Sequence, residues 1–479
     1  MSHSDKISID KSDKLASKHR ESGNSYYAQK EWFDALICYN KSITFSNSKK
    51  VICLAYANRS AVFFELKRYE DCMKNIQWAR ENRYPANKML KLNEREKKCI
   101  DLMTKSVKPE DPWSFFKLSY PANEKIPWIA NCVEMRTTEK YGRGIYATKD
   151  LKAGDVICLE QPFIHCFTNS SVDSNLPDAY YAHCYYCFKT CMLNLIPCIR
   201  TNALMFCSPE CREIIYSKCL NMETFMCDNV KILAFIMDGF NGKEKFEDFS
   251  NNNDIKKLNK TIFDYDFSDA EDPENKEKLT KSFLSLKSIN EFKVRNFCLS
   301  QNHLSDHTRN HILGIRSINE QRTHFYNGDQ TVINSGNSIS TFVSLLNHSC
   351  IPNVHSFSVD NKVSVIVLKP VKAGEQLFRS YCTHIFHFFD QLELLINYKF
   401  KCDCKACTDK NVPKFFPPSI WKIPSTFMSR DDFDEAKDCL KEGNHYINTN
   451  TKSPDEINRY MEINYSIIGT LAYYCTFPC

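Results

Sequence analysis

The sequence has no uninterrupted apolar run of roughly 18 residues, the length that a helix needs to cross a bilayer. Its first residues, Met1 to Lys11, are polar and contain no apolar core, unlike a secretory signal peptide. These two absences predict a protein without a membrane span and favour an intracellular location.

The chain also lacks a strong charge of either sign. Its formal net charge is +5 over 479 residues, too small to indicate a nucleic-acid surface, so no direct nucleic-acid partner is expected. Hydrophobic residues make up 43% and charged residues 25%, a composition typical of folded proteins. Because single cores rarely grow beyond about 250 to 300 residues, this length predicts several domains.

Cysteine, by contrast, is abundant, with 24 residues. Disulfides are rare in a reducing compartment, where clustered thiols favour metal binding instead. Cys184-x2-Cys187 and Cys207-x3-Cys211 are two close pairs separated by about twenty residues. Because this spacing can bring four thiolates to one tetrahedral ion, it predicts a zinc site.

A second cysteine group lies near the end of the chain. Cys402, Cys404 and Cys407 supply three thiolates, whereas a structural zinc takes four ligands. Cys350, in the run Asn-His-Ser-Cys, is the candidate for the fourth ligand. It lies about 50 residues earlier, so the spacing alone does not establish the pairing.

Residues 12–105 show apolar positions at helical spacing. Two segments within them resemble each other: each has a small residue where two helices would cross closely, Gly23 in the first and Ser60 in the second. An aromatic residue, Trp32 or Tyr69, then precedes the second helix of each unit. The pattern is similar to tetratricopeptide repeats, whose period is about 34 residues. An ordinary helical bundle is the alternative.

Strand-like alternation begins after a proline-rich connector. Residues 144–163 read as two strands around a Lys-Ala-Gly-Asp turn, which predicts a hairpin. Residues 361–382 repeat the pattern around Lys-Ala-Gly-Glu. The acidic, asparagine-rich stretch 244–277 is expected to be a loop.

Four further segments follow one another in an order that is typical of a known protein family. They are Gly142-Arg143-Gly144-Ile145-Tyr146-Ala147, then Asn347-His348-Ser349-Cys350 with Pro352-Asn353, then Gly374-Glu375 with Ser380-Tyr381, and finally Phe400 before the cysteine triplet. With a cysteine-rich finger between the first and the second, this order resembles the SET and MYND domain-containing lysine methyltransferases. The helical repeats are similar to those of the branch with an N-terminal tetratricopeptide region, the SET and MYND domain-containing protein 4 type.

The resemblance implies an α+β fold in which a MYND zinc finger interrupts a β-rich SET core and helical regions flank it. The expected parts are repeats at 12–105, a linker at 106–130, the first SET part at 131–183, the finger at 184–227, a helical insert at 228–330, the catalytic core at 331–400, a post-SET zinc segment at 401–415 and C-terminal helices at 416–479.

The resemblance also implies zinc and S-adenosylmethionine as cofactors, and transfer of a methyl group to a protein lysine. Tyr381 matches the family tyrosine that lies beside the transferring methyl. The residues implied to bind the cofactor are Arg143, Gly144, Asn319, Asn347, His348, Tyr381 and Phe400.

The finger departs from the family pattern at its second zinc. MYND fingers use seven cysteines and one histidine, but only Cys198 matches the second site cleanly, and Thr201 stands where its partner is expected. No histidine follows within the finger. The remaining candidate thiols are Cys191, Cys219 and Cys227. The second site is therefore either rebuilt or lost.

The family further implies that the repeats and the finger bind peptides or chaperone tails, and we expect residence in the cytoplasm and nucleus. The alternative is a catalytically weak scaffold acting as an adaptor in transcriptional regulation. The departure at the second zinc and the unusually polar segment 333–342 before Asn347 favour this alternative. The retained Tyr381 and the complete Asn347-His348-Ser349-Cys350 run oppose it.

Overall fold

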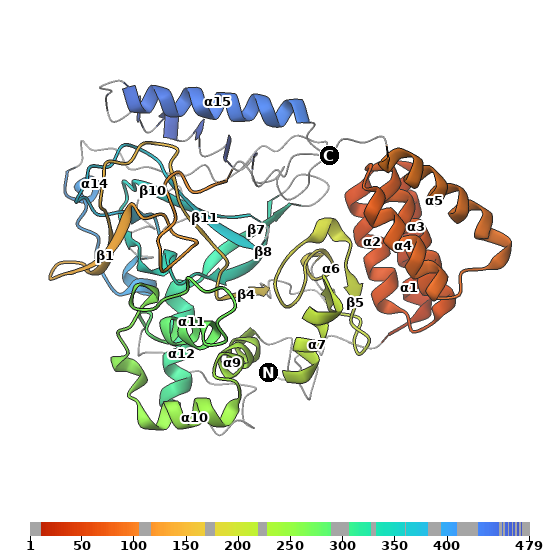
Figure 1. Ribbon diagram of the computed structural model, residues 1–479, viewed down its shortest axis with the longest axis horizontal. Helices are drawn as coiled ribbons and strands as arrows, with labels where there is room; N and C mark the ends of the chain where they lie inside the picture. Colours follow the sequence, from red (N-terminus) through yellow and green to blue (C-terminus); the bar gives the residue numbers. More distant parts are fainter. Residues whose placement is uncertain are drawn as a thin grey trace.

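We analysed a computed structural model of the chain (Figure 1). The structure describes residues 11–104, 116–167, 178–218, 228–288, 306–326, 332–359, 361–381, 394–409 and 430–449, with scattered positions from 453 to 471. It is a mixed helical and β structure, as the sequence predicts.

The N-terminal part is a run of antiparallel helices, drawn in red and orange in Figure 1. The helices are α1 (Asp13–Ala28), α2 (Trp32–Phe45), α3 (Lys49–Glu65), α4 (Tyr69–Glu81) and α5 (Met89–Met103). Each packs on the next along the chain. The close crossing predicted at Gly23 is confirmed, because an added Cβ would lie 2.6 Å from the ring of Tyr39. The assignment to tetratricopeptide repeats stays a prediction.

The strands form several small sheets. Their bounds are β1 (Val133–Thr138), β2 (Gly142–Ala147), β3 (Val156–Glu160), β4 (Ile164–Phe167), β7 (Gln321–Tyr326), β8 (Val332–Ile339), β9 (Asn347–His348), β10 (Val354–Val359), β11 (Lys362–Val367) and β12 (Phe378–Arg379). The sheet orders are β1-β2, β10-β11-β3 and β4-β8-β7, and β12 pairs with β9 in parallel.

The predicted hairpin at 144–163 is wrong. Strand β2 pairs with β1, and β3 pairs with β11, so the two strands on either side of the turn have different partners. The two Lys-Ala-Gly turns instead lie against each other, because Leu151 and Val371 exchange backbone hydrogen bonds of 2.8 and 3.0 Å. Alternation along a strand indicates which face is buried, but it does not identify the neighbouring strand.

The insert is more helical than the sequence predicts. Its helices are α9 (Asp228–Gly239), α10 (Lys243–Asn252), α11 (Asn275–Leu284) and α12 (Asp306–Asn319). Helix α10 lies in the stretch that was expected to be a loop. Its polar composition conceals two aromatic contacts, since Phe246 is fully buried against Phe240 and the partly buried Phe249 packs on the same ring. Two aromatic side chains on one face can fix a short helix whose remaining positions are mostly polar.

The cysteine-rich segment lies between the helical bundle and the β core (Figure 1). It contains α6 (Ala179–Ala182), β5 (Ile196–Pro197), β6 (Met205–Phe206) and α7 (Pro209–Lys218). One hydrophobic cluster runs from the bundle into this finger. Bundle and finger therefore share a core and do not form separate modules.

A buried arginine reinforces this junction. Arg59 of α3 is fully buried and donates to Asn40 of α2, Asn75 of α4 and the carbonyl oxygen of Leu195 in the finger, at 2.5, 2.7 and 2.8 Å. Asn194 completes the network by accepting from Arg59 and donating to Asp71. The polar face of α2, α3 and α4 is thus occupied by the chain's own finger.

The C-terminal helix α15 (Arg430–Thr449) covers the β core (Figure 1). Asn448 accepts a hydrogen bond of 2.9 Å from the backbone of Ala153 in the first Lys-Ala-Gly turn. Asn444 lies against Gly154, whose φ of +93° and missing Cβ allow the approach. Within the described residues, no helix is both long and apolar enough to span a membrane.

We predict that Arg59→Met lowers the free energy of unfolding by about 3 kcal/mol, because it leaves several buried acceptors without a donor. Urea denaturation would measure this change. Lys91→Ala, at an exposed position of α5, is the control and should change the stability by less than about 0.5 kcal/mol. An equally small effect of Arg59→Met would contradict the proposed importance of the network.

A buried histidine predicts acid sensitivity. His165 of β4 stacks on Phe188 at 4.7 Å, and burial, with the nearby Lys231, lowers the pKa of His165 to about 3. Below the unfolded-state pKa of about 6.5, only the unfolded chain takes up this proton, so stability should fall as the pH decreases from 6.5 towards 3. His165→Gln should reduce this slope by about 1.4 kcal/mol per pH unit in denaturation measured between pH 6.5 and 4.5. An unchanged slope would contradict the assignment.

Candidate active site

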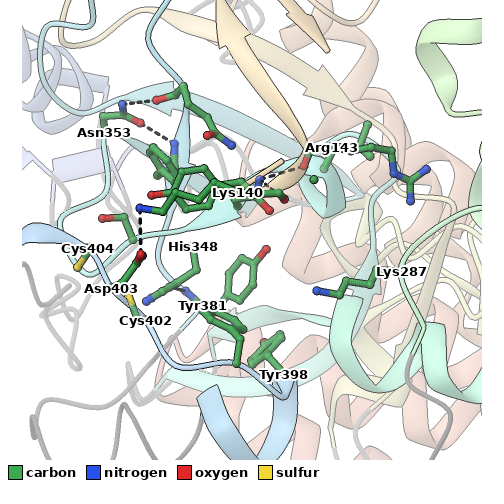
Figure 2. A pocket seen from close by; sticks show the side chains of 18 of the residues that line it. Lys140, Arg143, Lys287, His348, Asn353, Tyr381, Tyr398, Cys402, Asp403 and Cys404 are labelled. Carbon is green, nitrogen blue, oxygen red and sulfur yellow. Dashed lines mark hydrogen bonds and ion pairs between the residues drawn. The ribbon is translucent and has the colours of Figure 1, made fainter. Parts of the chain in front are cut away.

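A pocket of about 1080 Å³ lies where segments distant in the sequence meet (Figure 2). It is lined by the β1–β2 turn, the ends of α11 and α12, strands β9 and β12, and the segment 398–405. Figure 2 shows His348, Tyr381 and Tyr398 together in the pocket, with Lys287 and Arg143 on its other side. All sequence-predicted cofactor residues except Gly144 line this pocket.

Asn347 fixes the wall next to β2. Its side-chain amide donates to the carbonyl oxygen of Arg143 at 2.9 Å and more weakly to that of Tyr141 at 3.4 Å. Gly144 lies behind this contact: a Cβ there would be 2.2 Å from Nε2 of Gln376 and 2.9 Å from Nδ2 of Asn347. The glycine is therefore required by side chains that hold the pocket wall, which the sequence could not reveal.

His348 and Tyr381 form the centre of the pocket. Nδ1 of His348 accepts from the backbone N–H of Tyr381 at 2.9 Å, so a neutral His348 carries its proton on Nε2. The hydroxyl of Tyr381 donates to the carbonyl oxygen of Leu346 at 2.8 Å. Burial raises the pKa of Tyr381, although the nearby Arg379 opposes this rise. Tyr381 is therefore a neutral phenol held at both ends.

Phe400 and Asn319 close two other sides. The ring of Phe400 lies 6.0 Å from that of His348 and edge-on to Tyr381 at 6.4 Å. Asn319 ends α12, and its amide donates to the carbonyl oxygens of Lys287 and Ile315, both at 2.8 Å. Its role is to hold the segment that carries Lys287 against the helix.

Arg143 points away from the pocket centre (Figure 2). One of its terminal nitrogens donates to the carbonyl oxygen of Ser285 at 2.7 Å. The other, Nη1, is buried without a hydrogen-bond partner among the described residues, and so is Nε2 of Gln376. Unsatisfied buried donors are rare in proteins. The guanidinium of Arg143 is turned away from the pocket, but Gln376 lines it, and its buried donor fits a ligand that carries hydrogen-bond acceptors.

The polar segment before Asn347 has an internal explanation. Glu160 of β3 is buried. Its carboxylate accepts hydrogen bonds from the hydroxyl of Ser340 and the hydroxyl of Thr341, and also from the backbone N–H groups of Thr341 and Phe342. Burial raises the pKa of Glu160 while these bonds oppose the rise. Two of the polar side chains that departed from the family pattern, Ser340 and Thr341, thus face a buried carboxylate and hold the turn that leads to Asn347.

The first cysteine group comes together as the spacing suggested. The sulfur atoms of Cys184, Cys187, Cys207 and Cys211 all lie within 4.8 Å of one another. Two of these separations, Cys187–Cys207 and Cys207–Cys211, are 3.5 and 3.4 Å. Four thiolates around one zinc are about 3.8 Å apart, given Zn–S bonds of about 2.3 Å. This group can hold a structural zinc.

The second group contains Cys350 together with Cys402, Cys404 and Cys407, again within 4.8 Å. Folding therefore supplies the fourth thiol that the sequence spacing could not. Nε2 of His348 lies 3.4 Å from the sulfur of Cys350, in position to donate its proton to a metal-bound thiolate. The metal centre and the pocket thus share a hydrogen-bonded contact.

The second finger site stays a prediction. The sulfur of Cys198 lies 3.2 Å from the hydroxyl of Tyr216, and among the described residues it belongs to neither four-sulfur group. Cys191 contacts the first group without joining it. Cys219 and Cys227 lie outside the described residues.

Two pocket residues were missed by sequence reasoning. Tyr398 packs beside Tyr381 with ring centroids 4.7 Å apart, and Lys287 enters from the segment just after α11. Arg379, which contacts the ring of Tyr381 from outside the pocket lining, was also missed. Tyr398 is two residues before Phe400, and this proximity was the only signal in the sequence. Lys287 belongs to an unremarkable polar segment.

Comparison with known proteins shows what this part of the chain resembles. Residues 142–382 match the family model for the SET domain, which is half of the chain. The protein-lysine N-methyltransferase SMYD4 of Danio rerio is 25% identical over 223 residues, covering 44% of this chain and 29% of that protein. The mouse SMYD4 is 26% identical over 275 residues (44% and 34%), and the N-lysine methyltransferase SMYD2 of Gallus gallus 29% over 149 residues (30% and 33%).

The chain thus spans about a third of the length of these curated relatives. Among solved structures, the SET domain of LSMT bound to lysine and AdoHcy matches with a TM-score of 0.24 and 12% identity, covering 72% of this chain and 87% of that one. A similarity this low does not bear on the fold.

We predict two zinc ions per chain, one for each four-sulfur group. Cys407→Ser should remove one zinc and leave the other, and Cys198→Ser should remove none, because its sulfur contacts Tyr216 instead of a cysteine group. Elemental analysis of the purified chain measures the ratio. Three zinc ions in the wild type and two in Cys198→Ser would contradict this prediction and show that the second finger site binds zinc.

Proposed function

The chain belongs to the SET domain family, and from this premise we propose that it is a protein-lysine N-methyltransferase that uses S-adenosylmethionine. The observation that carries the proposal is the convergence of Asn347, His348, Tyr381 and Phe400 on one pocket beside a four-sulfur centre. These residues come from separate segments, and chance assembly of the whole set would be exceptional.

The pocket fits the proposed cofactor in size and in chemistry. When bound, S-adenosylmethionine supplies an electrophilic methyl group on a positively charged sulfur. Asn347, which keeps β2 in place, and the aromatic ring of Phe400 would hold the two ends of this ligand. The buried donor of Gln376 offers a partner for one of its polar groups.

The chain's own contribution is positioning and exclusion of water. Tyr381 is held at its backbone by His348 and at its hydroxyl by Leu346, so the phenol oxygen keeps one orientation in the pocket. Its free lone pair can accept a hydrogen bond from a lysine amine and aim the nitrogen at the methyl group. Holding two reactants in line removes much of the entropic cost of the reaction.

The adaptor alternative loses one of its supports. The polar segment before Asn347 favoured a reshaped cofactor wall, yet Ser340 and Thr341 bind the buried Glu160. Its other support, the departure at the second finger zinc, remains, because Cys198 belongs to neither four-sulfur group among the described residues.

Partners and location follow as parts of the same proposal. We propose a protein substrate presenting a lysine, and residence in the cytoplasm and nucleus, as family resemblance implies. Peptides or chaperone tails would have to use a face of the bundle other than the one around Arg59, because the finger covers that face.

The test is isothermal titration of the zinc-loaded chain with S-adenosylmethionine, followed by a methyl-transfer assay. Asn347→Ala should weaken binding by about tenfold or more, because the loss of its hydrogen bonds loosens the wall at Arg143. Tyr381→Phe should retain binding within about twofold but lower the transfer rate by about 100-fold, as expected for loss of one positioned hydroxyl.

Each variant is the control for the other. Both substitutions lie in one pocket, but only Asn347→Ala is expected to weaken the binding of S-adenosylmethionine. A folded, zinc-loaded wild type that does not bind S-adenosylmethionine would overturn the enzyme proposal. Equal loss of binding in both variants would show a damaged pocket and contradict the separate roles.

A further inference from the structure

Lys287 is an exposed cation on the lining of the pocket, in the segment that follows α11. Figure 2 shows its ammonium directed into the pocket, toward the side on which Tyr381 and Tyr398 lie. Within the part of the chain that the structure describes, this ammonium forms no ion pair and no hydrogen bond. It is therefore available to a ligand that enters the pocket.

The backbone that carries Lys287 is held at two points. Its carbonyl oxygen accepts a hydrogen bond of 2.8 Å from the side chain of Asn319, and the carbonyl oxygen of Ser285 accepts one of 2.7 Å from Arg143. Arg143 belongs to β2, the strand that Asn347 holds through the backbone of Arg143. Lys287 thus extends from a fixed segment at the end of the pocket that Asn347 shapes.

The remaining lining residues offer hydrogen-bond donors, while their acids are already engaged. Among the described lining residues the acids are Asp403, which pairs with Lys140 at 2.9 Å, and Glu375, which accepts a backbone hydrogen bond of 2.8 Å from the second Lys-Ala-Gly turn. The hydroxyl of Ser344 and Nε2 of Gln376 are buried and have no hydrogen-bond partner among the described residues. Because unsatisfied buried polar groups are rare, this lining is suited to a ligand that carries acceptors.

The four-sulfur group of Cys350 lies on the other side of the pocket. Four thiolates around one divalent zinc ion keep an excess of negative charge. This group packs against Tyr381, and Figure 2 shows Cys402 and Cys404 across the pocket from Lys287. An anionic group of a ligand is therefore favoured at Lys287 and disfavoured beside the thiolates, where a positive group would be stabilised.

We propose that Lys287 binds the carboxylate of S-adenosylmethionine and thereby sets the direction in which this cofactor lies in the pocket. This inference rests on the proposed function and deepens it. The carboxylate is the anionic group of the ligand, and an ammonium–carboxylate contact is a charge-assisted hydrogen bond. With the carboxylate at Lys287, the positive sulfur of the ligand lies toward Tyr381 and the thiolates, so each charge meets its complement.

The experiment compares two ligands that differ in one carboxylate. The probes are S-adenosylhomocysteine and its decarboxylated analogue, in which a hydrogen atom replaces the carboxylate, and isothermal titration of the zinc-loaded chain gives the Kd of each. Lys287→Met should weaken the binding of S-adenosylhomocysteine by about tenfold without weakening that of the analogue, as expected for the loss of one charged hydrogen bond. Lys287→Arg, which keeps the charge, should hold the ratio of the two Kd values within about threefold of the wild type.

Lys401→Met is the matched control. Lys401 also lines the pocket, but it precedes Cys402 of the four-sulfur group. This substitution removes an equal charge from the other side of the pocket, so it should leave the ratio of the two Kd values unchanged if Lys287 acts by direct contact. An equal change of the ratio in Lys401→Met and Lys287→Met, with zinc retained in both, would show a general positive potential and overturn the contact at Lys287.

The outcomes separate this inference from the proposed function. An unchanged ratio in Lys287→Met, with both ligands bound, overturns the role of Lys287 and leaves the methyltransferase proposal intact. Failure of the wild type to bind either ligand overturns both. If Lys287→Met does not fold, Lys287→Gln removes the same charge with a smaller change in polarity and is judged by the same ratio.

Discussion

The contact between His348 and Cys350 is the point on which the site depends. Cys350 belongs to a four-sulfur group with three cysteines that lie some 50 residues later in the chain. His348 lies two positions before Cys350. Its Nε2 is 3.4 Å from the sulfur of Cys350, and its Nδ1 accepts a hydrogen bond from the backbone N–H of Tyr381. Assembly of the four-sulfur group therefore fixes the position of Tyr381, because the rigid imidazole ring of His348 is hydrogen-bonded to both Cys350 and Tyr381.

Buried polar groups have a similar role elsewhere in the molecule. Arg59 joins the helical bundle to the finger through the carbonyl oxygen of Leu195. Lys231 of the insert joins the finger to β4, because its ammonium donates to the carbonyl oxygens of Tyr185 and His165 at 2.5 and 2.6 Å. Both cations are fully buried. Such groups stabilise only one relative placement of the parts, so they specify how bundle, finger and core fit together.

Part of this architecture could be predicted from the sequence. Local signals were sufficient for the helices of the bundle, the crossing at Gly23 and the finger thiols, because each depends on residues close together in the chain. Cofactor positions could be named only because their motifs resemble a family. Long-range pairing was different: the alternation at 144–163 indicated strands correctly, but the neighbour of β3 is β11, over 200 residues away.

Single side chains that act through distant partners were also beyond sequence reasoning. Nothing in the sequence around Glu160 marks it, and its role exists only once Ser340 and Thr341 are folded against it. Similarly, the polar segment 333–342 suggested a reshaped cofactor wall, whereas in the fold Ser340 and Thr341 of this segment donate to the buried Glu160. The role of a buried polar residue can be assigned only when its hydrogen-bond partner is known.

The most direct measurement of the central claim is a crystal structure of the zinc-loaded chain with S-adenosylhomocysteine. We expect the ligand sulfur to face the hydroxyl of Tyr381 and the metal to be bound by Cys350 with its three partner cysteines. His348 should contact both the sulfur of Cys350 and the backbone of Tyr381. A ligand bound elsewhere, or a Tyr381 hydroxyl turned away from an occupied pocket, would contradict it.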